Sequence, residues 1–376
     1  MPVKNSSEDR LQKRLAEFIT PTPSARAVNG GEQVCVGTFI GAVRKQNEDR
    51  ALIIFASYPD QPDRDFVLGA ISDGIGGLPR GDEASVLTIS EFCAQVIRLS
   101  KLPIGARLLA AADAANEAVY SELKGKGGAT LSAAFIEKGQ IFGINVGDSR
   151  IYSVSTSRKL TQLTKDDTLA GYLARREGGF TGQADNSLVQ FVGMGKGVEP
   201  HIIDANGNET QSILVTTDGV HGAPEGALSE VARASRTNFE LANRLLTLST
   251  ILGGRDNATA LILPSTFLPD RPSQRGINIT CISPFDRLEI WIPMGGTDSL
   301  AVENDNYIRQ NDNMTNLRED APPEKAFFSK GQKGATTSRK RKRKIQKKKA
   351  SNNEAGLPLE EDRPPLDISF PERQKH

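Results

Sequence analysis

Short runs of apolar residues, bounded by Gly, Asp or Asn, recur along the first 264 residues and are typical of β-strands. The runs predict strands over residues 34–40, 51–56, 66–71, 129–136, 141–146, 151–154, 213–217 and 259–263. Many of the gaps between them are as short as hairpin loops. This spacing favours antiparallel pairing of the strands over a doubly wound parallel sheet.

Other stretches carry apolar residues at helical spacing. Residues 84–99 and 104–123 predict one pair of amphipathic helices, and residues 228–236 and 239–252 predict a second pair. The order is strands, two helices, strands, two helices and a last strand. We therefore expect an α+β fold in which antiparallel sheets are covered by helices.

The pattern changes after Pro264, where we place the end of the compact body. We divide the chain into an N-terminal extension over 1–31, a main domain over 32–264, a short β extension over 265–296 and a low-complexity tail over 297–376. The tail is poor in branched and aromatic residues and we expect it to be disordered. Residues 1–264 carry a net charge of −3 and residues 265–376 a net charge of +4.

Most of the basic excess lies in one block, from Arg339 to Lys349, in which nine of the eleven residues are Lys or Arg. Such a block binds polyanions such as nucleic acid, acidic proteins or anionic lipid, and in a eukaryote it is typical of a nuclear localisation signal. The alternative is a solvated tail that only aids solubility. The block contains no aromatic residue for base stacking, which argues against sequence-specific recognition of nucleic acid.

The composition limits the type of metal site and the cellular compartment that we expect. The chain has three His and three Cys, without disulfide or zinc-ligand spacing, so any metal is expected to be held by oxygen. We find no signal peptide and no apolar run long enough to span a membrane. We therefore expect a reduced, cytoplasmic protein.

Acidic residues follow or precede several predicted strands. Asp73, Asp148 and Asp218 stand at Gly-rich or Ser-rich strand exits, and further acids precede strands: Glu48, Asp49 and Asp256. Each one alone is an ordinary turn residue. Several such acids brought to one sheet rim would repel one another and bind cations, and all-oxygen ligands favour Mg²⁺ or Mn²⁺. Spacing alone leaves the two interpretations open.

Seven short motifs occur in one order: RKQNEDR (44–50), DGIGG (73–77), GGATL (127–131), VGDSR (146–150), LTKDD (163–167), TTDGV (216–220) and RDNAT (255–259). With these motifs the sequence resembles the metal-dependent serine/threonine protein phosphatases of the type-2C (PPM) family, in particular the bacterial-type members. The resemblance covers about residues 32–264. It implies a β-sandwich of two antiparallel sheets flanked by paired antiparallel helices, in four αββα layers, with a two-metal centre on its rim.

The resemblance also implies roles for individual residues. Asp73 aligns with the acid that bridges two Mg²⁺ or Mn²⁺ ions, Gly74 with the residue that lends its carbonyl, and Asp218 and Asp256 with the other direct ligands. Glu48 and Asp49 align with acids that hold metal-bound waters or complete the shell. Arg44 aligns with the catalytic arginine that grips the substrate phosphate, which a bidentate guanidinium suits better than Lys does. The implied reaction is in-line attack by a water that the two ions activate.

Three features depart from the family pattern. Ile75 stands where many relatives have the His that protonates the leaving alkoxide. Asp148 aligns with a ligand of an optional third ion, but Gly222 stands where its usual acidic partner would be, so a third ion is uncertain. The region 168–200, which looks like the family's flap, is Gly-rich and says little about substrates. His221 would be either a substitute near the metals or a plain turn residue, and the turn residue is the interpretation that we favour.

The sequence thus predicts an enzyme that hydrolyses phosphoserine and phosphothreonine in proteins, on targets of a Ser/Thr kinase, and we expect a monomer. The alternative is a catalytically weak phosphatase-like domain that binds phosphoproteins or a kinase, with a polyanion-binding tail. The retained set of Arg44, Asp73, Asp218 and Asp256 argues against that alternative.

Overall fold

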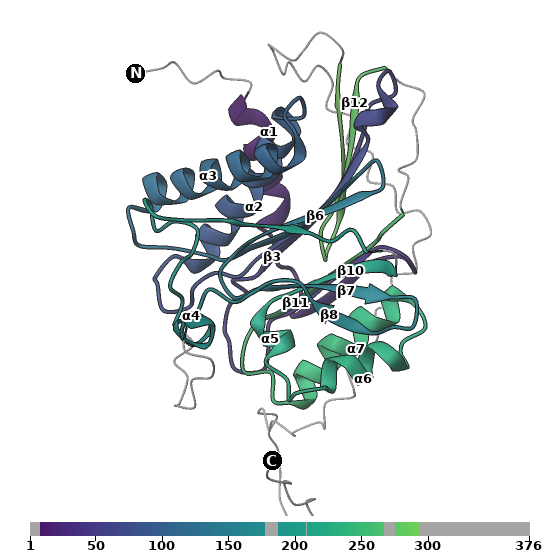
Figure 1. Ribbon diagram of the computed structural model, residues 1–376. Coiled ribbons are helices and arrows are strands. Elements are labelled where there is room, and N and C mark those ends of the chain that lie inside the picture. The colour runs from purple at the N-terminus through teal and green to yellow at the C-terminus, as the bar shows by residue number, and fades with distance from the viewer. Residues whose placement is uncertain (1–7, 177–186, 208, 267–274, 294–376) are drawn as a thin grey trace, which may run out of the picture. The chain divides into compact units, whose positions relative to one another are not determined.

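A computed structural model describes residues 8–176, 187–207, 209–266 and 275–293. The described residues form two antiparallel sheets packed face to face, with helices on both outer faces (Figure 1). The tail and its basic block lie outside the described residues.

The first sheet has six strands in the spatial order β1-β2-β11-β10-β7-β8. Their bounds are β1 (Arg26–Gly30), β2 (Cys35–Phe39), β7 (Arg150–Ser155), β8 (Leu160–Gln162), β10 (Thr210–Thr216) and β11 (Ala258–Pro264). The second sheet has seven strands in the order β13-β12-β3-β4-β5-β6-β9. Their bounds are β3 (Arg50–Ser57), β4 (Phe66–Ser72), β5 (Leu131–Glu137), β6 (Gln140–Val146), β9 (His201–Asp204), β12 (Ile277–Ile282) and β13 (Arg287–Ile292).

Helices cover the outer faces of both sheets. On the second sheet lie α1 (Glu8–Ile19), α2 (Gly81–Arg98) and α3 (Ile104–Leu123), and on the first sheet lie α5 (Asp218–His221), α6 (Ala227–Ala234) and α7 (Asn238–Ile251) (Figure 1). A further helix, α4 (Leu169–Arg176), and a 3₁₀ turn, Pro62–Arg64, lie in connections. None of the helices among the described residues combines the length and the apolar character that a membrane crossing requires.

Three apolar cores hold these layers together. One lies between the sheets, one between the second sheet and α1–α3, and one between the first sheet and α5–α7. Because a central strand contacts a core on each face, every residue of β3 and β4 is buried. This explains why these strands read as continuous apolar runs rather than as alternating ones.

The predicted fold class is confirmed: the chain is α+β, with two antiparallel sheets and flanking helix pairs. All eight predicted strands and all four predicted helices are present, with ends shifted by a few residues. Helices α1, α4 and α5 and strands β1, β8 and β9 were not predicted from the sequence. Strands β1, β8 and β9 lie at sheet edges, and α4 and α5 are short, so they leave little periodicity. Helix α1 is different, because Leu11, Leu15 and Ile19 recur at helical spacing and are buried, and this signal was overlooked.

The domain division drawn from the sequence remains a prediction. The structure adds that β1 pairs with β2 across the proposed boundary at residue 32. The hairpin of β12 and β13 is part of the second sheet, since β12 pairs with β3. Both flanking segments therefore extend the two sheets of the sandwich.

Candidate metal centre

The strand ends carry the predicted acids to one place. Arg50 at the start of β3 pairs with Ser72 at the end of β4, so Asp49 and Asp73 leave the second sheet at the same end. In the first sheet, β10 ends just before Asp218 and the paired β11 begins just after Asp256. The charges of four other acids act on the carboxyl of Asp73: Asp49, Asp148, Asp218 and Asp256.

Asp49 is only 3% exposed. Its Oδ2 accepts hydrogen bonds from the hydroxyls of Thr217 and Thr259, at 2.9 and 2.7 Å. Its Oδ1 is buried and has no hydrogen-bond partner. Burial raises the pKa of Asp49 to about 7, and the charge of Asp218 adds to the effect against the two hydrogen bonds. A carboxylate with one unsatisfied oxygen at this depth needs a positive partner.

Asp73 and Asp218 likewise carry buried carboxyl groups with raised pKa values. Burial raises the pKa of Asp73 well above its usual range, and the neighbouring carboxylates raise it further. Burial also raises the pKa of Asp218, followed by the charge of Asp256. The Oδ1 atom of Asp218 is buried without a hydrogen-bond partner. The cluster therefore either takes up protons or binds cations.

Asp256 pairs with Arg44 at the outer side of the cluster. The guanidinium Nη2 of Arg44 lies 2.7 Å from Oδ2 of Asp256, and both side chains are about one-third exposed, at 37% and 34%. The hydrogen bond to Asp256 raises the pKa of Arg44, while burial opposes it. The predicted phosphate-binding cation thus lies at the edge of the acidic cluster, within reach of solvent.

Two glycines allow the loops of this site to touch. A Cβ at Gly74 would lie 2.3 Å from the carbonyl oxygen of Gly81, at the start of α2. A Cβ at Gly219 would lie 2.0 Å from the carbonyl oxygen of Asn257. Neither position has room for any side chain, because both contacts are with backbone atoms.

The loop before β3 is fixed by Asn257. Its side-chain Oδ1 accepts a hydrogen bond from the backbone N–H of Glu48, at 2.8 Å. Its Nδ2 donates to the carbonyls of Ile40 and Gln46, at 2.7 and 3.1 Å. The carbonyl of Glu48 in turn accepts from the N–H of Gly74, at 3.3 Å. These contacts join the two sheets at the acidic rim, and burial raises the pKa of Glu48 there.

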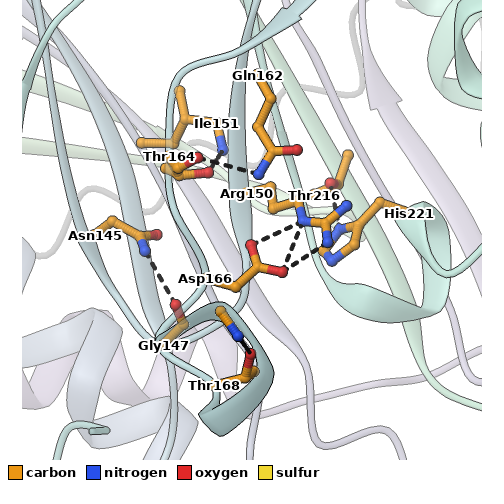
Figure 2. Close-up of polar contacts among 11 residues, drawn as sticks. Asn145, Gly147, Arg150, Ile151, Gln162, Thr164, Asp166, Thr168, Thr216 and His221 are labelled. Carbon is orange, nitrogen blue, oxygen red and sulfur yellow. Dashed lines mark hydrogen bonds and ion pairs between the residues drawn. The ribbon is translucent and has the colours of Figure 1, made fainter. Parts of the chain in front are cut away.

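Asp148 belongs to the side of the cluster, where the charges of Asp218, Asp166 and Arg150 act on its carboxyl. Burial raises its pKa to about 7, followed by the charges of Asp218 and Asp166. Arg150 forms a two-pronged contact with Asp166, in which Nε and Nη2 donate at 2.9 and 2.6 Å. The guanidinium of Arg150 is therefore held by Asp166 in a partly buried ion pair (Figure 2).

His221 lies beside Arg150 and is 9% exposed (Figure 2). A 2.9 Å hydrogen bond joins its Nδ1 to the hydroxyl of Thr216. Burial lowers the pKa of His221 well below its usual range, and the charge of Arg150 lowers it further. His221 is thus a buried, neutral imidazole that holds the end of β10.

The donor set fits hard divalent cations. It offers carboxylate oxygens, two of them buried and unpartnered, and backbone carbonyls, without sulfur ligands. Within the described ranges, no group of three or more His, Cys, Asp and Glu side chains is arranged to hold an ion as it stands. Mg²⁺ needs only one or two carboxylates and keeps several waters, so ligands shared between two ions do not have to converge on one point.

Three positioning residues were missed in the sequence analysis. Thr217 and Thr259 bind Oδ2 of Asp49, and Asn257 holds the loop of Glu48. Two of them belong to the motif RDNAT and one to TTDGV, so their motifs were noticed but only the acids received roles. A polar residue directly beside a proposed ligand is the signal that could have found Thr217 and Asn257, whereas Thr259 lies three positions after Asp256 and carries no such signal.

Comparison with known proteins decides the family. The family model described as protein phosphatase 2C matches residues 46–249, which is more than half of the 376 residues. This chain belongs to the protein phosphatase 2C family. The resemblance inferred from the seven motifs is thereby confirmed.

Two curated relatives of this family member illustrate the match. The serine/threonine phosphatase stp of Listeria monocytogenes is 29% identical over 239 residues, which cover 59% of this chain and 92% of the relative. The serine/threonine protein phosphatase PstP of Mycobacterium tuberculosis is 30% identical over 237 residues, covering 59% of this chain and 43% of PstP.

Solved structures agree with the fold. The PPM Ser-Thr phosphatase MsPP from Mycobacterium smegmatis, solved in complex with cacodylate, superposes with a TM-score of 0.51 at 27% identity, covering 61% of this chain and 96% of MsPP. The serine/threonine phosphatase Stp1 from Staphylococcus aureus, at 22% identity and a TM-score of 0.53, shares the fold.

Proposed function

We propose that this phosphatase 2C family member hydrolyses phosphoserine and phosphothreonine in proteins, using Mg²⁺ or Mn²⁺ at the acidic cluster. The observation that carries the proposal is the pair of buried, unpartnered carboxylate oxygens, Oδ1 of Asp49 and Oδ1 of Asp218, among further acids. Such oxygens cost free energy unless a cation compensates them. The relatives named serine/threonine phosphatases support the substrate class.

Each acid then has a role. Asp73, whose carboxyl feels the charges of the other four acids, would lie between two ions, with the carbonyl of Gly74, Asp218 and Asp256 as further direct ligands. Glu48 and Asp49 would complete the shells. When bound, the two cations supply a polarised phosphoryl group and a water of lowered pKa as the nucleophile.

Arg44 would bind the phosphate of the substrate. In the structure its guanidinium already lies at the rim, where Asp256 holds it by one hydrogen bond. Among the described residues, no hydrogen bond engages its second terminal nitrogen or its Nε, and a planar guanidinium can offer two parallel N–H groups to phosphate oxygens. A substrate phosphate would thereby be oriented toward the acids.

We assign no protein side chain as the acid for the leaving alkoxide. Ile75 cannot donate a proton, and His221 is buried, neutral and bonded to Thr216. A solvent molecule at the centre therefore has to protonate the leaving group. We also propose that Asp148 is an auxiliary acid and that a third ion is not required, because Gly222 provides no second carboxylate to hold such an ion.

We propose that the substrates are targets of a Ser/Thr kinase, that the protein acts as a monomer in the cytoplasm, and that the block from Arg339 to Lys349 binds polyanions. The three buried cysteines are unpaired, which suits a reducing compartment.

The test is release of phosphate from a phosphothreonine peptide by full-length protein, with and without added Mn²⁺ or Mg²⁺. We expect turnover only with the metal, and complete loss on adding a chelator. Undiminished turnover in excess chelator would remove the metal-dependent mechanism.

A further inference from the structure

The segments that flank the matched region 46–249 meet behind the acidic cluster. The end of α1 and the residues after it approach from one side, and the turn between β12 and β13 approaches from the other. Between them remains a cavity of ≈ 10 Å³, lined among others by Ile19, Thr22, Ser283, Phe285, Asp49 and Arg50. That volume is about the least that holds one water molecule, so the packing there is close.

Arg50 lies at this junction and is 7% exposed. Its Nη1 donates to the carbonyl of Asn47 at 2.7 Å and to the carbonyl of Asp49 at 2.8 Å. The two carbonyls lie on either side of Glu48. One guanidinium nitrogen therefore clasps the turn that presents both Glu48 and Asp49 to the cluster.

The N-terminal segment contacts this arginine directly, and the turn of the hairpin lines the same cavity as the arginine. Nη2 of Arg50 lies 3.5 Å from the carbonyl of Thr20, just after α1. The turn at Ser283 is tied to β1 by Asn29, whose Nδ2 donates to the carbonyls of Ser283 and Asp286 at 2.9 and 3.2 Å. Beside the turn, Ile282 at the end of β12 pairs with Ile53 in β3.

The covering of Arg50 has an electrostatic consequence. A buried guanidinium acts on nearby carboxylates through a medium of low dielectric constant, so its charge is felt more strongly than at the surface. The carboxylates of Asp82, Asp49 and Glu48 all interact with it. If the flanking segments moved away, water would reach Arg50 and its hold on the Asn47–Asp49 turn would weaken.

We propose that Arg50 is a positioning residue of the metal centre, and that the N-terminal segment and the β12–β13 hairpin set the affinity for the cations by keeping Arg50 in place. This inference rests on the proposed function. It assigns to segments outside the family match a part in the chemistry at the rim. The catalytic unit would then extend from α1 to β13.

The experiment compares three variants of the full-length protein, each with a single substitution. Arg50→Lys keeps the positive charge but removes the guanidinium and its several N–H donors. Asn29→Ala removes the hydrogen bonds that hold the turn of the hairpin, and Arg107→Lys is the control. Arg107 is also buried, donates to the carbonyl of Val96 and pairs with Glu137. It lies between α2, α3 and the second sheet, away from the acidic cluster of the metal centre. Binding of Mn²⁺ to metal-free protein is measured by calorimetry, together with the thermal midpoint and KM and kcat.

We expect Arg50→Lys to weaken Mn²⁺ binding about tenfold, the lower end of losses seen for residues that orient metal ligands. Asn29→Ala should weaken it in the same direction by a smaller factor, with KM for a small phosphoester nearly unchanged. Arg107→Lys should lower the thermal midpoint and leave Mn²⁺ binding as in the parent.

Two results would overturn the inference. One is an unchanged Mn²⁺ affinity in both Arg50→Lys and Asn29→Ala, and the other is an equal loss in Arg107→Lys, which would show only a general loss of stability. If Arg50→Lys does not fold, Asn29→Ala alone decides. Failure of the parent protein to bind Mn²⁺ would instead refute the proposed function.

Discussion

At the scale of single residues, the acidic rim is unfavourable in the metal-free protein. Asp49, Asp73 and Asp218 are held close together with pKa values raised by burial. A protein that needed only stability would place amides or apolar groups there. The close spacing of the carboxylates is therefore explained by a ligand that they bind. Removing one of the negative charges should lower activity without lowering the stability of the metal-free protein.

We predict that Asp218→Asn lowers turnover by several orders of magnitude, because a cation loses a charged ligand. The metal-free variant should be at least as stable as the parent, since the repulsion with Asp256 is relieved. Phosphate release and thermal unfolding check the two halves of the prediction. Asp113→Asn, at an exposed position of α3, is the matched control. Activity within about tenfold of the parent would make Asp218 a plain turn residue.

Arg44 offers a test of substrate binding. Arg44→Ala should raise KM for a phosphopeptide far more than it lowers the thermal midpoint, because the side chain is 37% exposed and its ion pair within the described part of the chain is with Asp256. A charge-assisted contact with phosphate contributes about 1.5–3 kcal/mol. Steady-state kinetics on Arg44→Ala, with Lys45→Ala as the neighbouring control, measure the difference. Equal kinetics in both variants would place Arg44 away from the phosphate.

His221 should make the fold sensitive to acid. Its pKa is lowered by burial, so below about pH 6.5 the unfolded chain takes up a proton that the folded chain excludes. The contribution of His221 to stability is therefore full at neutral pH and falls as the pH falls. Urea unfolding of the parent and of His221→Gln, from about pH 8 to about pH 5, should give curves that converge toward low pH.

The difference between the two proteins is the quantity to compare. Asp49 and Asp148, with pKa values raised to about 7, change stability in the opposite direction, because their folded forms bind protons that the unfolded chain has released. Subtraction removes this background. Parallel curves would show that His221 is not held neutral.

At the scale of elements, the loops of the site are fixed by backbone contacts. We predict that Gly219→Ala disrupts the start of α5, because the new Cβ would lie 2.0 Å from the carbonyl oxygen of Asn257. Stability and activity should both fall. Gly105→Ala in α3 is the control, since a Cβ there meets nothing within 4 Å and should stabilise the helix by about 0.4–1 kcal/mol. Thermal unfolding of both variants checks the prediction, and a harmless Gly219→Ala would contradict the close contact.

How much of the fold could be predicted from the sequence depends on the kind of element. The central strands β3 and β4 and the long helix α3 were predicted because continuous burial or helical periodicity marks them. Edge strands leave no period to detect, because β1 is partly buried throughout and β9 is mostly exposed. Among the site residues, the acids were predicted through motifs and strand ends. The hydroxyls of Thr217 and Thr259 were not, because a side-chain contact between distant segments leaves no periodic trace in the sequence.

At the scale of the whole molecule, charge is distributed unevenly along the chain. All proposed ligands precede Pro264, and residues 1–264 carry a net charge of −3, whereas the block from Arg339 to Lys349 has nine basic residues in eleven. Chemistry and polyanion binding should therefore be separable by a deletion that leaves the β12–β13 hairpin in place.

We predict that deleting residues 297–376 leaves turnover of a small phosphoester intact and abolishes salt-sensitive binding to polyanions. Binding through a dense basic block falls steeply as salt rises, because releasing counterions into a more concentrated salt solution gains less entropy. Retention on heparin or DNA over a salt gradient, for the full-length and shortened proteins, measures this. Equal retention would make the tail a solvated spacer, and loss of small-phosphoester turnover would place part of the tail in the catalytic unit.

The backbone contacts at Gly74 and Gly219 also limit how such a protein can evolve. Gly74 lies against Gly81, and Gly219 lies against Asn257, so each loop of the rim is shaped by the backbone of another. A mutation that enlarges one loop has to be matched at once by a change in its partner, and such double steps are rare. Inheritance would therefore keep the rim almost fixed, whereas additions could join the sheet edges, where β1 and the β12–β13 hairpin lie. New substrate preferences in this lineage would then arise by extending the outer strands and connections rather than by altering the loops that hold the acids.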